Sequence, residues 1–261
     1  MLSRNKSKFI NALKTKKFRA ETGCFLIEGD KLVSEVLAGR DIPVTELLST
    51  PDWLQHNRFL IHEGVDTITE VSDAELRKIS SFETPTGVMA VLKMPSAEYR
   101  EKNLAGKLSV SLDTIQDPGN LGTIIRTADW FGITDIFCSQ GCADCFNPKV
   151  VQASMGAVLR VNIHYVQLET LFEKLSQQNQ YVIYGSYLEG TSIYELEHTA
   201  SGMMVFGNES KGIHPTLKHL IKIPVTIPSF SSSAGHVESL NVSAAVAVFC
   251  SEFFRGKARK D

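Results

Sequence analysis

The segment that decides the fold reads Asp117-Pro118-Gly119-Asn120-Leu121-Gly122-Thr123-Ile124-Ile125-Arg126. It joins a hydrophobic strand to a helix through a Pro-Gly turn. Two further segments share this design, namely Val205-Phe206-Gly207-Asn208-Glu209-Ser210-Lys211-Gly212 and Glu238-Ser239-Leu240-Asn241-Val242-Ser243. Each connects a hydrophobic element to a polar turn. Three separated blocks of this kind predict one composite site.

Hydrophobic strands and helical patterns alternate around these blocks. We expect strands near 107–112, 134–139, 161–166, 181–187, 202–206 and 221–227, and helices near 120–131, 148–155, 168–178, 213–219 and 238–254. This alternation predicts an α/β domain whose parallel sheet is covered on both faces. Ligands of such sheets bind at the carboxyl ends of the strands. The three blocks begin at these ends, after residues 112, 206 and 227.

The amino-terminal part predicts a smaller α/β domain. Helices are expected near 7–19, 30–38 and 73–80, and strands near 24–28, 44–49, 58–61 and 87–93. Ser72-Asp73-Ala74-Glu75 is a capping-box start for the last helix. The polar stretch 94–103 breaks both periodicities. We therefore predict a first domain over 1–95, a linker over 96–106 and a second domain over 107–261.

Composition places the chain among globular proteins. It has 261 residues, of which 43% are hydrophobic and 21% charged, which is typical of soluble domains. No uninterrupted apolar run approaches the roughly 20 residues of a membrane helix, and the start lacks the apolar core of a secretory signal. We predict a cytoplasmic protein that does not enter a membrane.

The first twenty residues are basic and contain no acidic residue. An organelle transit segment has this composition, but Phe9, Ile10 and Leu13 recur at helical spacing, which favours a folded helix. The net charge of -2 confines any phosphate-binding surface to a local patch. The candidate phosphate contacts are Lys14, Lys16, Lys17 and Arg19.

The five cysteines are Cys24, Cys138, Cys142, Cys145 and Cys250. An odd number without an export signal argues against a disulfide framework. Three of them have the C-x3-C-x2-C spacing that also holds four-iron clusters. Because such short matches arise by chance, we favour reduced structural thiols and predict no metal site.

In order and residue types, the three blocks resemble the signature motifs of the SpoU/TrmH family of RNA 2′-O-ribose methyltransferases, which use S-adenosylmethionine. The resemblance implies a carboxyl-terminal trefoil knot and a homodimer formed through the catalytic domains. Lys17-Phe18-Arg19 and Phe25-Leu26-Ile27-Glu28-Gly29 resemble the family's substrate-recognition domain, a module akin to a ribosomal protein. Ribosomal RNA is the expected substrate and tRNA the second choice. A non-catalytic RNA-binding or assembly factor on this scaffold is the alternative. An oxidoreductase is disfavoured because no G-x-G-x-x-G follows a strand.

The resemblance also implies the site residues. The expected catalytic residues are Asn120, Arg126, Glu209 and Asn241, and the expected cofactor-binding residues are Gly207, Asn208, Ile227, Ser239 and Leu240. The family's arginine at the Arg126 position contacts RNA phosphate and is proposed to assist deprotonation of the 2′-hydroxyl. A guanidinium keeps its proton, so we assign phosphate positioning and alkoxide stabilisation instead. The alternatives are a surface Arg126 paired with Asp129, and Glu209 as a helix-start charge.

The third block departs from the family pattern. Residues 229–237 form a longer connection than the family has, and they include His236, the titratable group near neutrality in this insertion. We interpret His236 as a surface-loop residue. The helix from Leu240 to Phe254 is apolar on nearly every face, so we expect it to be buried all round. It would be a central core helix or a dimer-interface helix.

Overall fold

The computed structural model describes residues 2–95, 104, 106–177, 181–196, 201–231 and 238–255. Two compact units divide the chain. Unit 1 comprises Met1–Ser96 and Phe146–Gly156, and unit 2 comprises Ala97–Cys145 and Ala157–Asp261. Within the described residues, every helix is too short or too polar to span a lipid bilayer.

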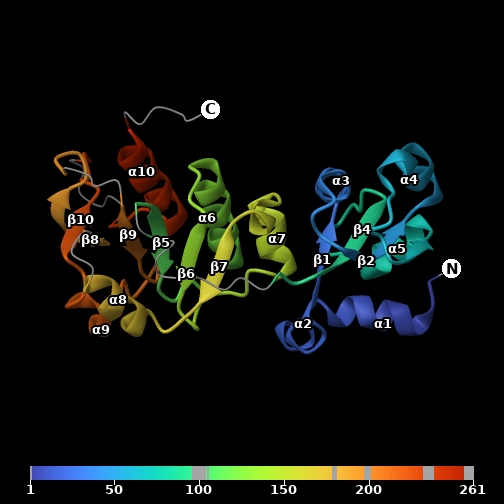
Figure 1. The fold of residues 1–261 in the computed structure, drawn as a ribbon, viewed down its shortest axis with the longest axis horizontal. Coiled ribbons are helices and arrows are strands. Elements are labelled where there is room, and N and C mark those ends of the chain that lie inside the picture. The colour runs from blue at the N-terminus through green and yellow to red at the C-terminus, as the bar shows by residue number, and fades with distance from the viewer. Residues whose placement is uncertain are drawn as a thin grey trace. The chain divides into compact units, whose positions relative to one another are not determined.

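Unit 1 is a four-stranded sheet with helices (Figure 1). Its elements are α1 (Arg4–Ala12), α2 (Lys16–Thr22), β1 (Cys24–Glu28), α3 (Asp30–Gly39), β2 (Val44–Ser49), α4 (Pro51–His56), η1 (Arg58–Leu60), β3 (Ile68–Glu70), α5 (Asp73–Ile79), β4 (Val88–Lys93) and α7 (Pro148–Ser154). The strand order is β1-β4-β2-β3, in which β4 is antiparallel to both neighbours and β2 is parallel to β3.

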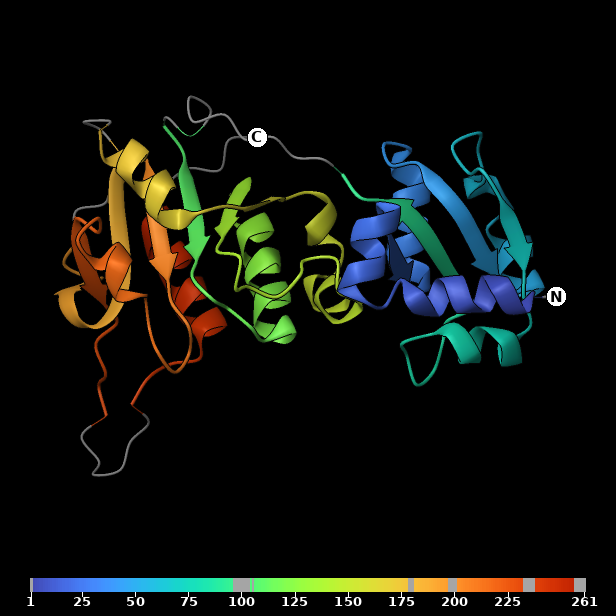
Figure 2. The same ribbon diagram turned by 90° about the horizontal axis from the view of Figure 1, so that it is seen from below.

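A hydrophobic cluster joins α1 and α5 to one face of this sheet. Ile10 and Leu13 of the first helical segment pack with Leu76, Leu26 and Met89. In Figure 2, α1 and α5 lie side by side. The capping box of α5 is present as predicted, and it extends to the chain start, because Glu75 Oε1 also accepts the Leu2 amide at 2.8 Å.

The segment Phe146–Gly156 lies far along the chain from the rest of unit 1. The Phe146 ring packs 4.5 Å from the ring of Phe25 on β1. Val150 and Val151 of α7 are buried. Apolar contacts therefore group this helix with unit 1, whereas the predicted division assigned 148–155 to the second domain.

Several predicted elements of unit 1 were wrong. The helix expected at 7–19 is two helices, with a break at Leu13 and Lys14. Arg19 explains the break, since its guanidinium turns inward and donates to the Leu13 carbonyl at 2.8 Å. Only 1% of Arg19 is exposed. Its predicted contact with RNA phosphate is therefore wrong, because its charge is used inside the fold.

The segment 50–61 was also misread. The strand expected at 58–61 is the 3-10 turn η1, and the structure adds α4 in this segment and β3 beyond it, neither of which was predicted. Thr50 Oγ1 accepts the Trp53 amide at 3.3 Å, and Pro51 occupies the first turn of α4. A threonine cap followed by proline is a helix-start signal, so α4 was detectable from the sequence.

Unit 2 is built on the predicted parallel sheet. Its elements are β5 (Leu108–Leu112), α6 (Pro118–Trp130), β6 (Asp135–Cys138), η3 (Ala157–Leu159), β7 (Asn162–Tyr165), α8 (Leu168–Ser176), β8 (Val182–Ser192), β9 (Gly202–Phe206), α9 (Pro215–Lys218), β10 (Ile223–Thr226) and α10 (Val242–Phe254). The order is β10-β8-β9-β5-β6-β7, and every neighbouring pair is parallel.

Helices cover both faces of the sheet, as alternate strand residues show. Val205 packs with Phe172 of α8 and Leu217 of α9. The next residue, Phe206, points to the opposite face and meets the ring of Phe249 on α10 at 5.0 Å. The prediction of a parallel sheet between two helical layers is confirmed.

The prediction that α10 is buried all round is wrong. Ala244 and Ser251 are exposed, while Ala247 and Val248 are half-buried. These positions recur every three to four residues and so share one side of the helix. Besides this stripe, the helix buries Val246 and other residues against the sheet and α6.

Candidate active site

One edge of the six-stranded sheet gathers the three sequence blocks. Because all six strands are parallel, their carboxyl ends lie at the same edge. The block 117–126 follows β5, and the block 205–212 begins inside β9. The block 238–243 leads into α10, which packs beside α6 (Figure 1).

Asn120 lies at the centre of this edge and contacts two other predicted catalytic residues. Its Nδ2 donates to Glu209 Oε1 at 2.7 Å, and its Oδ1 accepts from Asn241 Nδ2 at 3.0 Å. These partners are 89 and 121 residues away in sequence. The three side chains, which we call the Asn120 cluster, therefore form one hydrogen-bonded group that the fold assembles.

Helix caps fix two members of the cluster. Asp117 is the N-cap of α6, and its Oδ1 accepts a hydrogen bond from the backbone N–H of Asn120 at 2.8 Å. Asn241 is the N-cap of α10, and its Oδ1 accepts the Ser243 amide at 2.9 Å. The first cap fixes the backbone at Asn120, and the second fixes the side chain of Asn241. Sequence reasoning did not single out Asp117, although an aspartate before a proline is a helix-start signal.

Arg126 stands apart from the Asn120 cluster. It is exposed on α6, and among the described residues no hydrogen bond or ion pair engages its guanidinium. The alternative pairing with Asp129 does not form, because Arg160 binds that carboxylate at 2.8 and 3.0 Å. The structure thus joins three of the four predicted catalytic residues and leaves the guanidinium of Arg126 open to a ligand.

The glycine loop 207–212 closes on itself. The Asn208 amide donates to the Gly212 carbonyl at 3.0 Å, and the Gly212 amide donates back at 2.8 Å. A Cβ on Gly207 would lie 2.1 Å from the Gly212 carbonyl carbon, so no side chain fits there. The backbone of the loop itself therefore requires glycine at position 207.

The Asn208 side chain is engaged within the protein. Its Nδ2 donates to the Thr114 carbonyl at 2.9 Å, and its Oδ1 accepts the amides of Ser210 at 3.0 Å and Lys211 at 3.1 Å. With all these contacts the side chain holds the loop. The main-chain amide and carbonyl of Asn208 are also bonded, to Gly212, so the contact of Asn208 with a cofactor stays a prediction.

Three further predicted cofactor residues lie open at this edge. Leu240 is 51% exposed, Ser239 is exposed and Ile227 is half-buried. Leu240 directly precedes Asn241, and an exposed apolar side chain next to a polar cluster suits a ligand with an apolar face and a charged group. This chemistry fits S-adenosylmethionine. Within 229–237, residues 232–237 and hence His236 lie outside the described residues.

The cysteine motif is buried beneath the same loops. Cys142 Sγ contacts the Leu112 carbonyl at 3.2 Å and accepts the Ile115 amide at 3.3 Å. A hydrogen bond from Cys138 lowers the pKa of the Cys142 thiol to about 7, and the same contact with burial raises the pKa of Cys138. The described residues hold no group of three or more His, Cys, Asp or Glu side chains able to bind a metal.

The predicted RNA-binding lysines belong to unit 1. Lys17 is exposed and lies 3.9 Å from Glu21, and Lys16 is exposed as well. Lys14 is half-buried and donates to the Ser80 carbonyl at 3.0 Å, and burial lowers its pKa although Glu28 opposes the shift. The exposed pair is therefore better placed for phosphate than Lys14.

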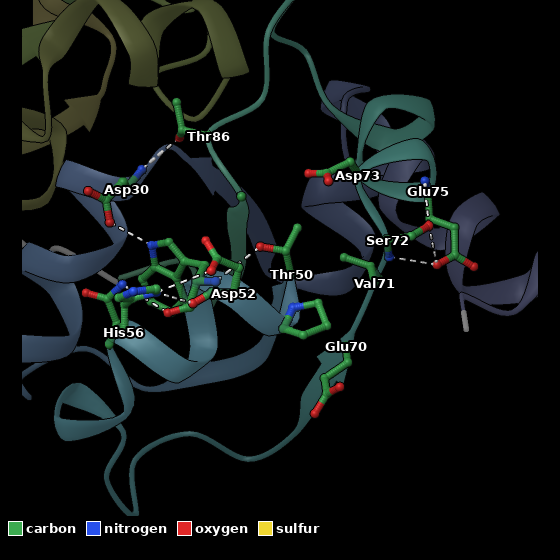
Figure 3. Close-up of a pocket in the computed structure, with 14 residues that line it drawn as sticks. Asp30, Thr50, Asp52, His56, Glu70, Val71, Ser72, Asp73, Glu75 and Thr86 are labelled. Atoms are coloured by element: carbon green, nitrogen blue, oxygen red, sulfur yellow. Dashed lines mark hydrogen bonds and ion pairs between the residues drawn. The ribbon is translucent and has the colours of Figure 1, made fainter.

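An open groove of about 1050 Å³ in unit 1 is unsuited to RNA. Its lining contains five carboxylates and neither lysine nor arginine; the acidic residues are Asp30, Asp52, Glu70, Asp73 and Glu75 (Figure 3). A phosphate chain would be repelled by this lining. The groove also contains none of the predicted site residues.

The chain was compared with known families. Residues 107–251 match the SpoU rRNA Methylase family, and residues 4–90 match the MRM3-like substrate binding domain. The chain belongs to the SpoU rRNA methylase family. The Asn120 cluster and the open residues Ile227 and Leu240 all fall within the matched SpoU region.

Three proteins are similar to this SpoU family member over nearly their full length. The 23S rRNA (guanosine(2553)-2′-O)-methyltransferase RlmP of Bacillus subtilis is 31% identical, over 90% of each chain. A TrmH-family protein from Porphyromonas gingivalis is 37% identical, with a TM-score of 0.83 over 97% of this chain and 98% of that one. An AdoMet-bound rRNA methyltransferase from Sinorhizobium meliloti is 26% identical, with a TM-score of 0.85 over 99% and 97%.

Proposed function

We propose that this protein transfers a methyl group from S-adenosylmethionine to the 2′-hydroxyl of a ribose in RNA, with ribosomal RNA as the substrate class. The observation that carries the proposal is the contact of Asn120 with Glu209 and Asn241 in a chain of the SpoU rRNA methylase family. The names of the relatives from Bacillus subtilis and Sinorhizobium meliloti support ribosomal RNA over tRNA.

The residues at the sheet edge would divide the binding tasks. Ile227 and Leu240 would cover the apolar part of the cofactor, with the main chain of 207–208 and 239 beside them. Glu209 would place negative charge near the sulfonium. S-adenosylmethionine, when bound, supplies an electrophilic methyl group. No lysine or arginine hydrogen-bonds to the Asn120 cluster within the described residues, so the negative charge of Glu209 favours a cationic ligand.

Arg126 would hold an RNA phosphate and stabilise the developing alkoxide. A guanidinium is a fixed donor of five N–H groups and keeps its charge. It therefore stabilises the negative charge that develops on the ribose oxygen and does not itself remove the proton of the 2′-hydroxyl. Asn120 would orient the ribose, because its amide is fixed from both sides by Glu209 and Asn241.

The decisive experiment follows labelled methyl from S-adenosylmethionine into ribosomal RNA. A 2′-O-methyl group removes the hydroxyl that alkaline cleavage needs, so the label should remain in alkali-resistant dinucleotides. Arg126→Ala should lower turnover by at least ~100-fold while leaving cofactor affinity nearly unchanged. Arg255→Ala, at the far end of α10 from Asn241, is the matched control. Binding of RNA and cofactor without any transfer would favour the non-catalytic assembly factor.

We further propose the domain division 1–95, 96–106 and 107–261 along the chain, with RNA recognition in the first domain and the trefoil knot in the last. In this division Phe146–Gly156 belongs to the last domain by sequence, although it packs with unit 1. The match of residues 4–90 to a substrate binding domain supports the first assignment. The knot is supported by the convergence of residues 209 and 241 on Asn120. Cytoplasmic ribosome assembly is the proposed setting.

We also propose a homodimer through the catalytic domains. Trp130 at the end of α6 is 84% exposed. Phe131, next to it, packs 5.7 Å from the ring of Phe254, so Trp130 lies near the end of the open stripe of Ala244 and Ser251 on α10. An exposed tryptophan beside an apolar stripe supports association with a second copy of the chain.

A further inference from the structure

Thr114 has an unusual backbone conformation directly before the α6 cap. Its φ is +60°, and the other described non-glycine residues with positive φ are Arg40 and Met155. Those two end α3 and α7 as left-handed C-caps, a common helix ending. Thr114 ends no helix, and a β-branched residue rarely takes this conformation. Its surroundings must therefore hold it there.

Hydrogen bonds from three chain segments hold Thr114. Its amide donates to Ser139 Oγ at 2.8 Å, and its carbonyl accepts from Asn208 Nδ2 at 2.9 Å. Its hydroxyl donates to Asp113 Oδ1 at 2.9 Å, and Asp113 Oδ2 accepts the His214 amide at 2.8 Å. Asp113 is 6% exposed. Every polar group of Thr114 is thus tied to segments that follow β5, β6 or β9.

The bond from Asn208 lies next to a member of the Asn120 cluster. Asn208 immediately precedes Glu209, and Thr114 lies three residues before Asp117, the cap that holds Asn120. The peptide at Thr114 therefore links the loop carrying Glu209 to the turn carrying Asn120. A change of the Thr114 backbone would displace both loops together.

We propose that Thr114 is a positioning residue for the methyl transfer. It fixes the segments 113–120 and 207–214 relative to one another, so that Asn120 and Glu209 meet at hydrogen-bond distance. This inference rests on the proposed function. The proposal assigns Asn208 to the same task, since the Asn208 side chain donates a hydrogen bond to the Thr114 carbonyl.

Thr114→Val tests the proposal because it keeps the shape of the side chain and removes the hydroxyl that orients Asp113, the residue that holds the His214 amide of the second segment. We expect kcat for RNA methylation to fall by about 10- to 100-fold, since a small misplacement of reacting groups has effects of that order. The KM for RNA and the Kd for S-adenosylmethionine should stay within about threefold. Thr114→Ser retains the hydroxyl and should restore wild-type kcat.

Thr134→Val is the matched control. Thr134 also donates its hydroxyl to a neighbouring aspartate, Asp135, at 2.7 Å, but it precedes β6 at the opposite edge of the sheet. Its kcat should equal that of the wild type. Thr114→Gly adopts positive φ without strain and also lacks the hydroxyl, so it should lose kcat as Thr114→Val does. A folded Thr114→Val with wild-type kcat would overturn the proposal, as would an equal loss in Thr114→Ser.

Hydrogen exchange of the protein alone separates this inference from the proposed function. In Thr114→Val, or in Thr114→Gly should the valine variant not fold, amide exchange should accelerate in both 113–120 and 207–214. In Thr134→Val it should accelerate in neither. Acceleration confined to 113–116 would overturn the linkage. If the wild type transfers no methyl group, the proposed function fails, and the exchange result still decides whether Thr114 links the two segments.

Discussion

Replacing Asn120 with aspartate changes one functional group at the centre of the Asn120 cluster while keeping its size. The amide that donates to Glu209 at 2.7 Å becomes a carboxylate oxygen. A hydrogen bond to a charged group contributes about 1.5–3 kcal/mol. At this separation, Coulomb's law with a water-like dielectric adds a repulsion of about 1.5 kcal/mol, a value suited to a side chain as exposed as Glu209.

The lost hydrogen bond and the repulsion together destabilise the Asn120 cluster by about 3 kcal/mol. This is the low end of the range, because the two carboxylates can turn partly away from one another. If the reaction needs the cluster intact, this corresponds to a fall in kcat of about 100-fold.

Single-turnover transfer of labelled methyl groups to RNA measures this rate directly. Asn147→Asp is the matched control, because Asn147 caps α7 and aspartate caps a helix equally well. Thermal unfolding of both variants establishes that they are folded. Equal kcat in Asn120→Asp and the wild type at neutral pH would refute the role assigned to the Asn120 cluster.

Three further substitutions test other parts of the molecule. Trp130→Glu should shift the protein from dimer to monomer in light scattering, because a charge would be placed on the exposed apolar surface of α6. Lys16→Ala with Lys17→Ala should reduce the slope of log K for RNA against log salt by about 1.5, as expected for two lost phosphate contacts. Asp135→Asn should lower the Tm at pH 7 by about 2–4 °C, since a hydrogen bond from His164 lowers the pKa of Asp135 and stabilises the fold above its ordinary titration range. That stabilisation is lost as pH falls, so the Tm difference should vanish towards pH 3.

A specific result would contradict each of these three predictions. Phe59→Glu changes a similarly exposed aromatic of unit 1, and monomer formation by this variant too would point to a general effect of surface charge. An unchanged salt slope would exclude Lys16 and Lys17 from the RNA-binding surface. A Tm difference in Asp135→Asn that is constant from pH 7 to pH 3 would show that the charge of Asp135 contributes nothing.

Local patterns in the sequence determined most elements of the fold. The alternation of strands and helices predicted the parallel sheet, and the polar turns after residues 112 and 206 predicted the edge at which the site forms. Ser72 and Glu75 predicted a helix start that the structure contains. These features depend on hydrogen bonds within one turn and on which side of an element is apolar, and both repeat at fixed spacing along the chain.

Only the tertiary structure decided which residues meet. Asp129 pairs with Arg160, 31 residues away, rather than with Arg126 on the same helix. Arg19 serves the core instead of the surface. Asn120 meets Asn241 across 121 residues because parallel strands bring distant chain ends to one edge. Such pairs cannot be predicted from residue spacing along the chain, since the packing of the whole sheet decides which distant residues meet.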